Sequence, residues 1–230
     1  MKFGSIIKTS IIDYPNRIST VLFTKRCNFK CPFCHNKELV NNTIKDIPKK
    51  EILNHLHNLS PLVDSIVISG GEPTLYKDLP KFLKDIKKLG LFIKLDTNGY
   101  NPKMLYKLIK ENLIDYIAMD VKHDILDSEG YNKITGSNIN INLIIESIEL
   151  IKKSNIDYQF RTTVIKGFHT IENIYNISLA LLDSKLYVLQ TFNPYNVLNI
   201  EWSKYQAFSF EELKQIAELI KFNVKKIEII

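Results

Sequence analysis

The 230-residue chain is poor in cysteine, with only three, and it contains a single tryptophan. The cysteines are Cys27, Cys31 and Cys34, which fall within one span of eight residues. An odd, closely spaced set excludes the disulfide framework that stabilises small secreted domains. We therefore expect these thiols to have a chemical role.

Long apolar runs are also missing. No stretch approaches the roughly 18 uninterrupted apolar residues of a membrane-spanning helix. The N-terminus reaches polar Lys8, Thr9 and Ser10 without the apolar core of a signal peptide, so we expect a cytoplasmic protein. Apolar residues make up 45% of the chain and charged residues 24%, which excludes disorder, collagen-like repeats and a coiled coil.

Arginine is scarce: only Arg17, Arg26 and Arg161 occur among the 31 basic residues. The net charge of +6 therefore comes almost entirely from lysines, which are scattered over expected helix faces. No stripe of basic and aromatic residues is present, so nucleic acid is not an expected partner. A guanidinium can do what an ammonium cannot, which makes Arg161 a candidate functional residue.

Short β-rich runs alternate with amphipathic helical segments along the chain. The runs are Ile18–Thr24, Ser65–Ser69, Phe92–Thr97, Tyr116–Val121, Tyr158–Ile165 and Leu186–Phe192; helices are expected near 52–59, 79–89, 102–112, 141–151, 170–182 and 210–221. Such alternation favours an α/β fold of parallel strands with right-handed crossovers. Six units are fewer than the eight of a closed TIM barrel, so a partial barrel is expected, with an open doubly wound sheet as the alternative. Residues 1–17 are predicted to be an extended lead-in, and 224–230 a last strand.

The cysteines lie on a loop after the first predicted strand. Thiolates suit zinc, copper or iron–sulfur groups. A structural zinc ion takes four protein ligands, and the one local fourth candidate is His35, which is awkwardly placed directly after Cys34. Three thiolates on a four-iron cluster would leave one iron open for a small molecule. A zinc knuckle, or three unrelated thiols, remains the alternative.

Other polar groups follow the predicted strands. They are Gly70–Pro73, Asp96–Gly99, Asp120–Lys122, Arg161 within the fifth strand, and Asn193–Asn196. Taken singly, each could be a tight turn, a helix cap, a solvated residue or a structural ion pair. Because ligands bind at the carboxyl ends of strands in parallel α/β folds, the groups together predict one site. It would hold a cluster and a polar, zwitterionic small molecule.

The cysteine spacing, with Phe33 before the last cysteine, resembles the signature of the radical S-adenosylmethionine (SAM) family. Gly70-Gly71-Glu72-Pro73 resembles that family's glycine–glycine–glutamate motif. Several further segments resemble activating enzymes of glycyl radical enzymes, most closely the activating proteins of anaerobic ribonucleoside-triphosphate reductase. These segments are 8–15, 31–39, 96–99, 118–122 and 161–164.

The resemblance implies a partial (β/α)6 TIM-type barrel, with residues 1–230 as a single radical SAM domain. It implies that the three cysteines bind three irons of a [4Fe-4S] cluster and that SAM chelates the fourth. The residues implied to lie around SAM are Phe33, His35, Gly70, Gly71, Glu72, Asp96, Thr97, Asn98, Asp120, Lys122, Arg161 and Asn196. In related pyruvate formate-lyase activating enzymes, an Asp-Thr pair and a later Asp can hold a monovalent cation, here Asp96, Thr97 and Asp120.

The implied activity is reductive cleavage of SAM, which generates a glycyl radical on a partner enzyme. The expected partner is anaerobic ribonucleotide reductase, with flavodoxin or ferredoxin as electron donor. Alternatives are another glycyl radical enzyme such as pyruvate formate-lyase, a small molecule or RNA as substrate, or a non-catalytic zinc or nucleic-acid-binding module. Asn196 stands where the lyase activators have a histidine that contacts SAM, which weakens the assignment to the lyase activators.

Overall fold

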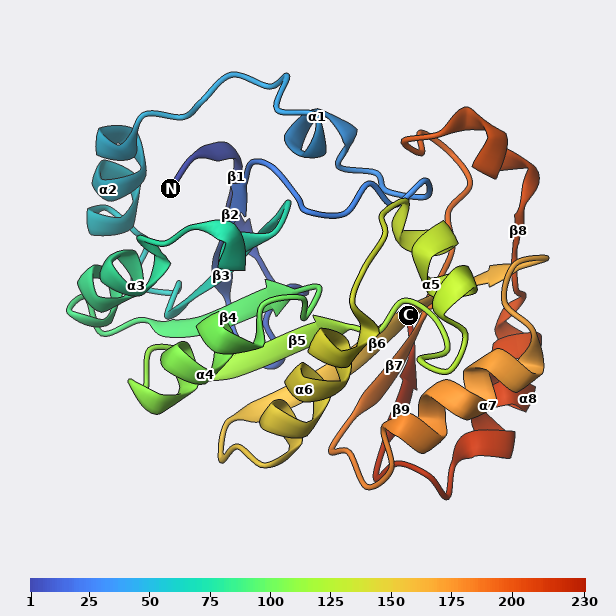
Figure 1. The fold of residues 1–230 in the computed structure, drawn as a ribbon. Helices are drawn as coiled ribbons and strands as arrows, with labels where there is room; N and C mark the ends of the chain where they lie inside the picture. Colours follow the sequence, from blue (N-terminus) through green and yellow to red (C-terminus); the bar gives the residue numbers. More distant parts are fainter.

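Six parallel strands form a curved sheet in the computed structural model, which describes residues 1–230 (Figure 1). They pair in chain order and are β2 (Ser19–Thr24), β3 (Ser65–Gly70), β4 (Phe92–Thr97), β5 (Tyr116–Asp120), β6 (Asp157–Lys166) and β7 (Tyr187–Thr191). Every bound lies within one residue of the sequence prediction. Apolar runs mark these strands because both faces of a parallel sheet are covered.

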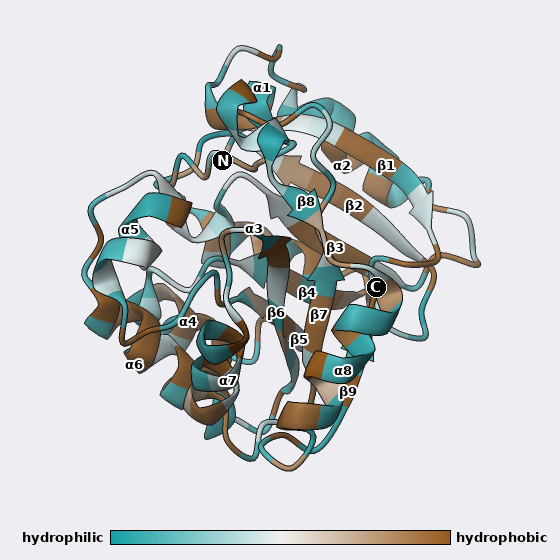
Figure 2. Ribbon diagram, turned by 90° about the vertical axis from the view of Figure 1, so that its right-hand side faces the viewer, coloured by the Kyte–Doolittle hydropathy of each residue, from teal (hydrophilic) through white to brown (hydrophobic).

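The predicted helices are also present, and they lie along the outer side of the sheet (Figure 1). They are α2 (Lys49–His57), α3 (Leu79–Lys87), α4 (Pro102–Lys110), α6 (Ile141–Lys152), α7 (Ile171–Ala180) and α8 (Phe210–Ile220). Figure 2 shows hydrophilic and hydrophobic stretches on the same helices, as expected for elements with one buried side. None of the helices is both long and apolar enough to span a bilayer.

Four short helical elements were not predicted: α1 (Lys37–Val40), α5 (Ser128–Thr135) and the 3₁₀ turns Pro73–Leu75 and Ile200–Lys204. Helix α5 is only eight residues long and carries two large apolar residues, Tyr131 and Ile134, which hid it. Its ends are marked, however, because Asp127 caps the first turn and Gly136 takes the left-handed conformation that ends the helix.

Strands at both edges keep the barrel incomplete. Part of the extended lead-in pairs as β1 (Phe3–Ser10), antiparallel to β2, and the predicted last strand appears as β9 (Ile227–Ile229), parallel to β7. The two edge strands do not pair with each other. A two-residue strand, β8 (Gln206–Ala207), pairs with the end of β6. The partial (β/α)6 barrel is therefore confirmed, with these additions.

Two apolar clusters organise the interior. A cluster of 44 buried residues fills the space between sheet and helices. Tyr14, Val21, Val67 and Tyr116 form a separate cluster inside the barrel, on the first halves of their strands and the turn before β2. This second cluster closes the amino end of the barrel, so the polar side chains of the strands gather at the carboxyl end.

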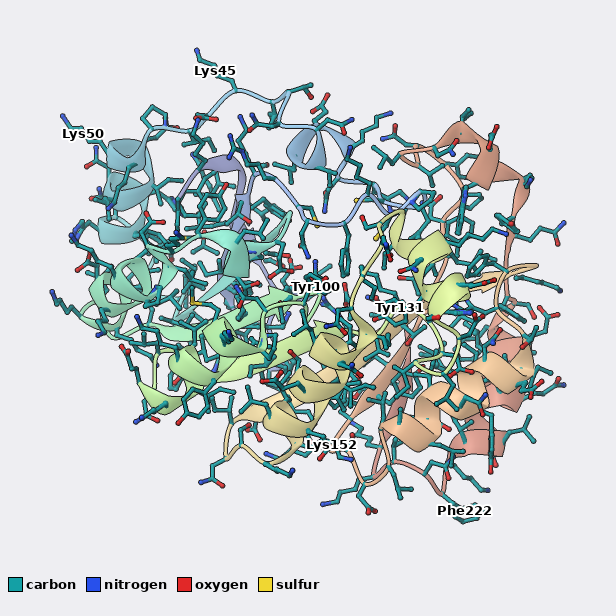
Figure 3. All side chains as sticks on the ribbon, in the orientation of Figure 1. Lys45, Lys50, Tyr100, Tyr131, Lys152 and Phe222 are labelled. Carbon is teal, nitrogen blue, oxygen red and sulfur yellow. The ribbon has the colours of Figure 1, made fainter.

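The surface confirms that most lysines are solvated. Lys45 and Lys50 project outward in Figure 3, whereas Tyr131 lies inside the molecule, where it is fully buried. Lysines of α3 and α6 pair with acidic residues of the surface, as Lys84 does with Glu111. Exposed pairs of this kind contribute little to stability.

Candidate active site at the carboxyl ends of the strands

A cavity of about 370 Å³ opens at the carboxyl ends of β2 to β7. It brings together every site residue predicted from the sequence except Asn196. These are Cys27, Cys31, Phe33, Cys34, His35, Gly70, Gly71, Glu72, Asp96, Thr97, Asn98, Asp120, Lys122 and Arg161. Strands β3 to β6, the loop after β2 and the turns after β3, β4 and β5 therefore contribute to a single site.

The cysteine loop, residues 25–36, presents its three thiols to this cavity, and none is in a disulfide. A tight turn joins two of them, since the Cys34 N–H donates to the Cys31 carbonyl at 3.0 Å. Neighbouring segments fix the loop: Lys30 N–H donates to the carbonyl of Thr135 in α5, and Asn199 N–H donates to the Pro32 carbonyl. The loop is thus held at both sides before any ligand binds.

Burial keeps the thiols protonated in the ligand-free protein. It raises the pKa of Cys27 to about 12 and that of Cys31 to about 11. Metal ligation needs the thiolate, so a bound metal must supply the stabilising charge.

The residues present fit a multi-iron group better than a zinc ion. No three His, Cys, Asp or Glu side chains surround one point closely enough to hold a single ion. His35, the local candidate for a fourth zinc ligand, is exposed, and its Nε2 lies 2.9 Å from the Asn193 carbonyl. Three separated soft ligands around one cavity suit a cluster with one iron left open.

The two glycines of the predicted glycine motif are required by the protein backbone itself. A Cβ at Gly71 would lie 1.8 Å from the Arg26 carbonyl oxygen, and one at Gly70 would lie 2.5 Å from Thr24 N. Gly70 also has a φ of +108°, which side chains disfavour. The end of β3 therefore lies directly against the backbone that enters the cysteine loop.

Both oxygens of the Glu72 carboxylate accept hydrogen bonds from the protein itself. Its Oε1 accepts from the hydroxyls of Thr74 at 2.6 Å and Thr97 at 2.8 Å, and its Oε2 accepts from Asn98 N–H at 2.7 Å. Burial raises the pKa of Glu72 above its usual value, against the opposing effect of these donors. Glu72 thus ties the end of β3 to the end of β4, which leaves the backbone of this motif to meet a ligand.

Five ionic side chains lie close together inside the barrel, at and just below its carboxyl end, and we call them the charged layer. They are Lys94, Asp96, Asp120, Lys122 and Arg161. Arg161 Nε donates to Asp120 Oδ1 at 2.8 Å, and Lys122 Nζ lies 3.2 Å from Asp120 Oδ2. Burial alone would raise the pKa of Asp120, but Arg161 and then Lys122 hold it at about 2. Asp120 is therefore ionised at any ordinary pH.

A monovalent cation beside Asp96, Thr97 and Asp120 is not supported. Lys94 Nζ donates to Asp96 Oδ1 at 2.7 Å, and Ser69 Oγ donates to Asp96 Oδ2 at 2.9 Å. Thr97 is bound to Glu72, and Asp120 is paired with two cations of the charged layer. The oxygens expected to bind an ion are already engaged by protein donors.

Two predicted site residues have roles that the sequence did not indicate. Asn98 turns toward the cysteine loop, where its Nδ2 donates to Asn28 Oδ1 at 2.9 Å. Asn196 lies outside the cavity in a left-handed turn with φ of 59°, and its Oδ1 accepts from Lys37 Nζ at 2.6 Å. The turn after β7 carries this side chain back toward α1, where it lines a neighbouring pocket together with His35.

Sequence reasoning missed seven residues of the cavity wall: Phe29, Asn36, Val40, Ser69, Thr163, Gln190 and Thr191. Thr163 could have been found, because it lies two residues after Arg161 on the same strand and so on the same face. Gln190 pairs with Thr163 across β6 and β7. Which residues of two strands lie side by side depends on the tertiary fold, and the local sequence does not reveal it.

Sequence reasoning also missed two residues, Tyr131 and His169, that hold the backbone of Lys122 by hydrogen bonds. The Lys122 N–H donates to the Tyr131 hydroxyl at 3.2 Å, and its carbonyl lies 3.0 Å from His169 Nε2. His169 Nδ1 accepts from Ile165 N–H, so its Nε2 must carry the proton. Burial, and then nearby His123, lower the pKa of His169 to about 3. A neutral histidine therefore holds the backbone of Lys122.

Comparisons with known proteins agree with the geometry. A family model described as the radical SAM superfamily matches residues 21–176. A candidate glycyl-radical enzyme activating enzyme of Methanocaldococcus jannaschii is 36% identical over 95% of this chain and 91% of that protein. The pyruvate formate-lyase-activating enzyme of Clostridium pasteurianum is 29% identical over 99% of this chain and 95% of that protein.

Among solved structures, Streptococcus suis SuiB has a TM-score of 0.65 at 18% identity. The match covers 91% of this chain and 48% of SuiB, so this chain spans about half of that protein. At this identity the likeness supports the fold alone.

Gly71→Ala should damage the cysteine loop. Its Cβ would overlap the Arg26 carbonyl, so the loop must move, at a cost of about 1–3 kcal/mol in unfolding free energy. After anaerobic reconstitution, iron and sulfide per chain should also fall. The control is Gly90→Ala, which meets no atom within 4 Å but has a φ of +77°, so it should lose about 1 kcal/mol from backbone strain, without loss of iron. Full iron content in Gly71→Ala would contradict the assigned contact.

His169→Gln should flatten the acid side of the stability profile. The pKa of His169 is about 3 in the fold and about 6.5 in the unfolded chain, so the unfolded state binds more protons between these values. Stability is therefore lost as pH falls from about 6.5 toward 3, by up to about 1.4 kcal/mol per pH unit. Glutamine keeps a donor and an acceptor but does not titrate.

Urea unfolding at pH 7, 6 and 5 measures this difference, with the exposed His57→Gln as control. Parallel profiles for wild type and His169→Gln would show that His169 is not held neutral by the fold.

Proposed function

The chain belongs to the radical SAM superfamily, and we propose that it cleaves SAM reductively to generate a glycyl radical on a partner enzyme. The observation that carries this proposal is the convergence of three free thiols and four of the five charged-layer side chains on one cavity. A [4Fe-4S] cluster, when bound, would supply the electron for the cleavage. The proposal takes residues 1–230 as a single radical SAM domain.

The cysteine loop would hold the cluster through Cys27, Cys31 and Cys34. Because the protein offers no fourth thiol, one iron would be left for the amino and carboxylate groups of SAM. The backbone of Gly70 and Gly71 would hold the methionyl amine. Phe33 and His35 would lie beside the adenine.

The charged layer would bind the anionic end of the ligand. Arg161 and Lys122 are buried cations with donors beyond those that Asp120 and Asp96 accept. Their pKa values are raised, chiefly by the neighbouring Asp120, against the opposing effect of burial. They stay charged, so a carboxylate that enters the cavity meets fixed positive charge.

Apolar side chains would protect a reactive species from water. Phe29 and Phe33 are buried in the cavity wall, and Phe33 packs against Trp202 with ring centroids 6.3 Å apart. Exclusion of water prevents side reactions of reactive intermediates. Because β1 and β9 do not pair with each other, the barrel stays open between them, which would allow a loop of a partner protein to enter.

The near full-length likeness to proteins named as activating enzymes supports a glycyl radical enzyme as the partner. We propose anaerobic ribonucleoside-triphosphate reductase as that partner, and flavodoxin or ferredoxin as the electron donor. Asn196, outside the cavity, supports a difference from the lyase activators. Pyruvate formate-lyase is the second candidate, favoured by the similarity to the clostridial activating enzyme.

Cys31→Ala should abolish iron–sulfur binding and SAM cleavage while the fold survives. Cys31 is buried, yet its loss removes only a small side chain, so cooperative unfolding should persist. The measurements are visible absorbance after anaerobic reconstitution and release of 5′-deoxyadenosine after reduction. Ser69→Ala, which alters the same cavity without removing a thiol, should retain the iron. A colourless wild-type protein, or cleavage by Cys31→Ala, would refute the cysteine assignment.

The partner proposal predicts a stable organic radical on the reductase. The reduced, reconstituted protein is mixed anaerobically with SAM and either purified anaerobic ribonucleoside-triphosphate reductase or purified pyruvate formate-lyase. Electron paramagnetic resonance should show a glycyl doublet with the reductase, lost when its radical glycine is replaced by alanine. A doublet with the lyase alone would select the second candidate. SAM cleavage without a radical on either would refute both activating roles.

A further inference from the structure

One buried lysine inside the barrel has no part in the proposed chemistry. Lys94 lies on β4 two residues before Asp96, so both side chains leave the same face of the strand. Its register partners are Val67 on β3 and Tyr116 on β5, which belong to the apolar cluster at the amino end. Lys94 therefore stands between that cluster and the rest of the charged layer.

The ammonium of Lys94 is almost completely buried and has one hydrogen-bond partner. Its side chain is 3% exposed, and its Nζ donates to Asp96 Oδ1 at 2.7 Å. Arg161 Nη1 lies 3.6 Å from the same oxygen. Asp96 thus lies between two cations: Lys94, on the side of the amino end, and Arg161, which lines the cavity.

The charge balance explains why a lysine would be kept in such a place. The charged layer contains three cations, Lys94, Lys122 and Arg161, and two carboxylates, Asp96 and Asp120. Without Lys94 the remaining four charges would cancel, and a ligand carboxylate would add an uncompensated negative charge. An unpaired charge in a buried site is costly. With Lys94 present, one ligand carboxylate makes the layer neutral.

We propose that Lys94 is the built-in counter-cation of the site. Its ammonium takes the place beside Asp96 that a free monovalent cation would otherwise have to fill. Lys94 does not line the cavity, so it acts as a positioning residue through Asp96 and Arg161. The identity of the ligand as SAM rests on the proposed function; the charge compensation of Asp96 does not.

A counter-cation can be replaced by a free cation, whereas a purely structural side chain cannot. Removing the side chain beyond Cβ leaves a space of ammonium size beside an ionised Asp96. A small monovalent cation should enter that space and restore the lost charge. A neutral side chain of similar length should instead block it.

The experiment compares Lys94→Ala with Lys94→Met in potassium, ammonium and tetramethylammonium chloride at equal ionic strength. Wild type should bind SAM equally in all three salts after reconstitution. Lys94→Ala should bind about tenfold more weakly in tetramethylammonium, and potassium or ammonium should recover most of that loss. Lys94→Met should stay weak in every salt. Lys87→Ala removes a lysine paired with Asp115 outside the barrel, and should show no dependence on the cation.

The melting temperature of the cluster-free protein gives a second readout that does not depend on SAM. Potassium and ammonium should raise it for Lys94→Ala relative to tetramethylammonium, but not for Lys94→Met. If Lys94→Ala does not fold, Lys94→Ser replaces it as the small variant.

Equal behaviour of the small variant and Lys94→Met in all salts would overturn the counter-cation role, as would unchanged SAM binding in the small variant. Failure of the wild type to bind SAM would instead sink the proposed function. The melting temperatures would then decide the role of Lys94 on their own.

Discussion

The site depends on one constraint: β2 to β7 pair in parallel and in chain order. This arrangement brings the carboxyl ends of six strands to the same end of the barrel, although the residues there are spread from Cys27 to Thr191. Each strand needs only one or two polar residues at its end to contribute to a shared cavity. A mixed sheet would divide the same residues between two ends.

The barrel interior separates stability from function along the strands. Tyr14, Val21, Val67 and Tyr116 close the amino end with apolar contacts. The charged layer follows directly above, where every carboxylate has cationic partners. Such a layer is weak evidence for stability, because the desolvation of its ions offsets their attraction. Its pattern is better explained by a ligand that is itself charged.

The cysteine loop is positioned by backbone contacts rather than by its thiols. The double glycine of β3 admits the backbone at Arg26, α5 holds Lys30, and Asn199 holds Pro32. Burial leaves the thiols neutral, so they add little to this order until a metal binds. The loop can therefore keep its shape independently of the cluster it is proposed to carry.

The sequence by itself determined the elements and most of the site. Apolar runs located six strands to within one residue, and the cysteine spacing, the glycine pair and Arg161 identified the cavity wall. Helix α5 escaped because it is short and carries few apolar residues, and Asn196 lies outside the cavity, in a left-handed turn after β7. Only the tertiary structure decided which atoms are free. Glu72 and Asp96 look alike as candidate ligands in the sequence, yet neighbouring strands bring Thr97, Lys94 and Ser69 to them. Periodicity is a local property, whereas the partner of a buried polar atom depends on everything that reaches the same point in space.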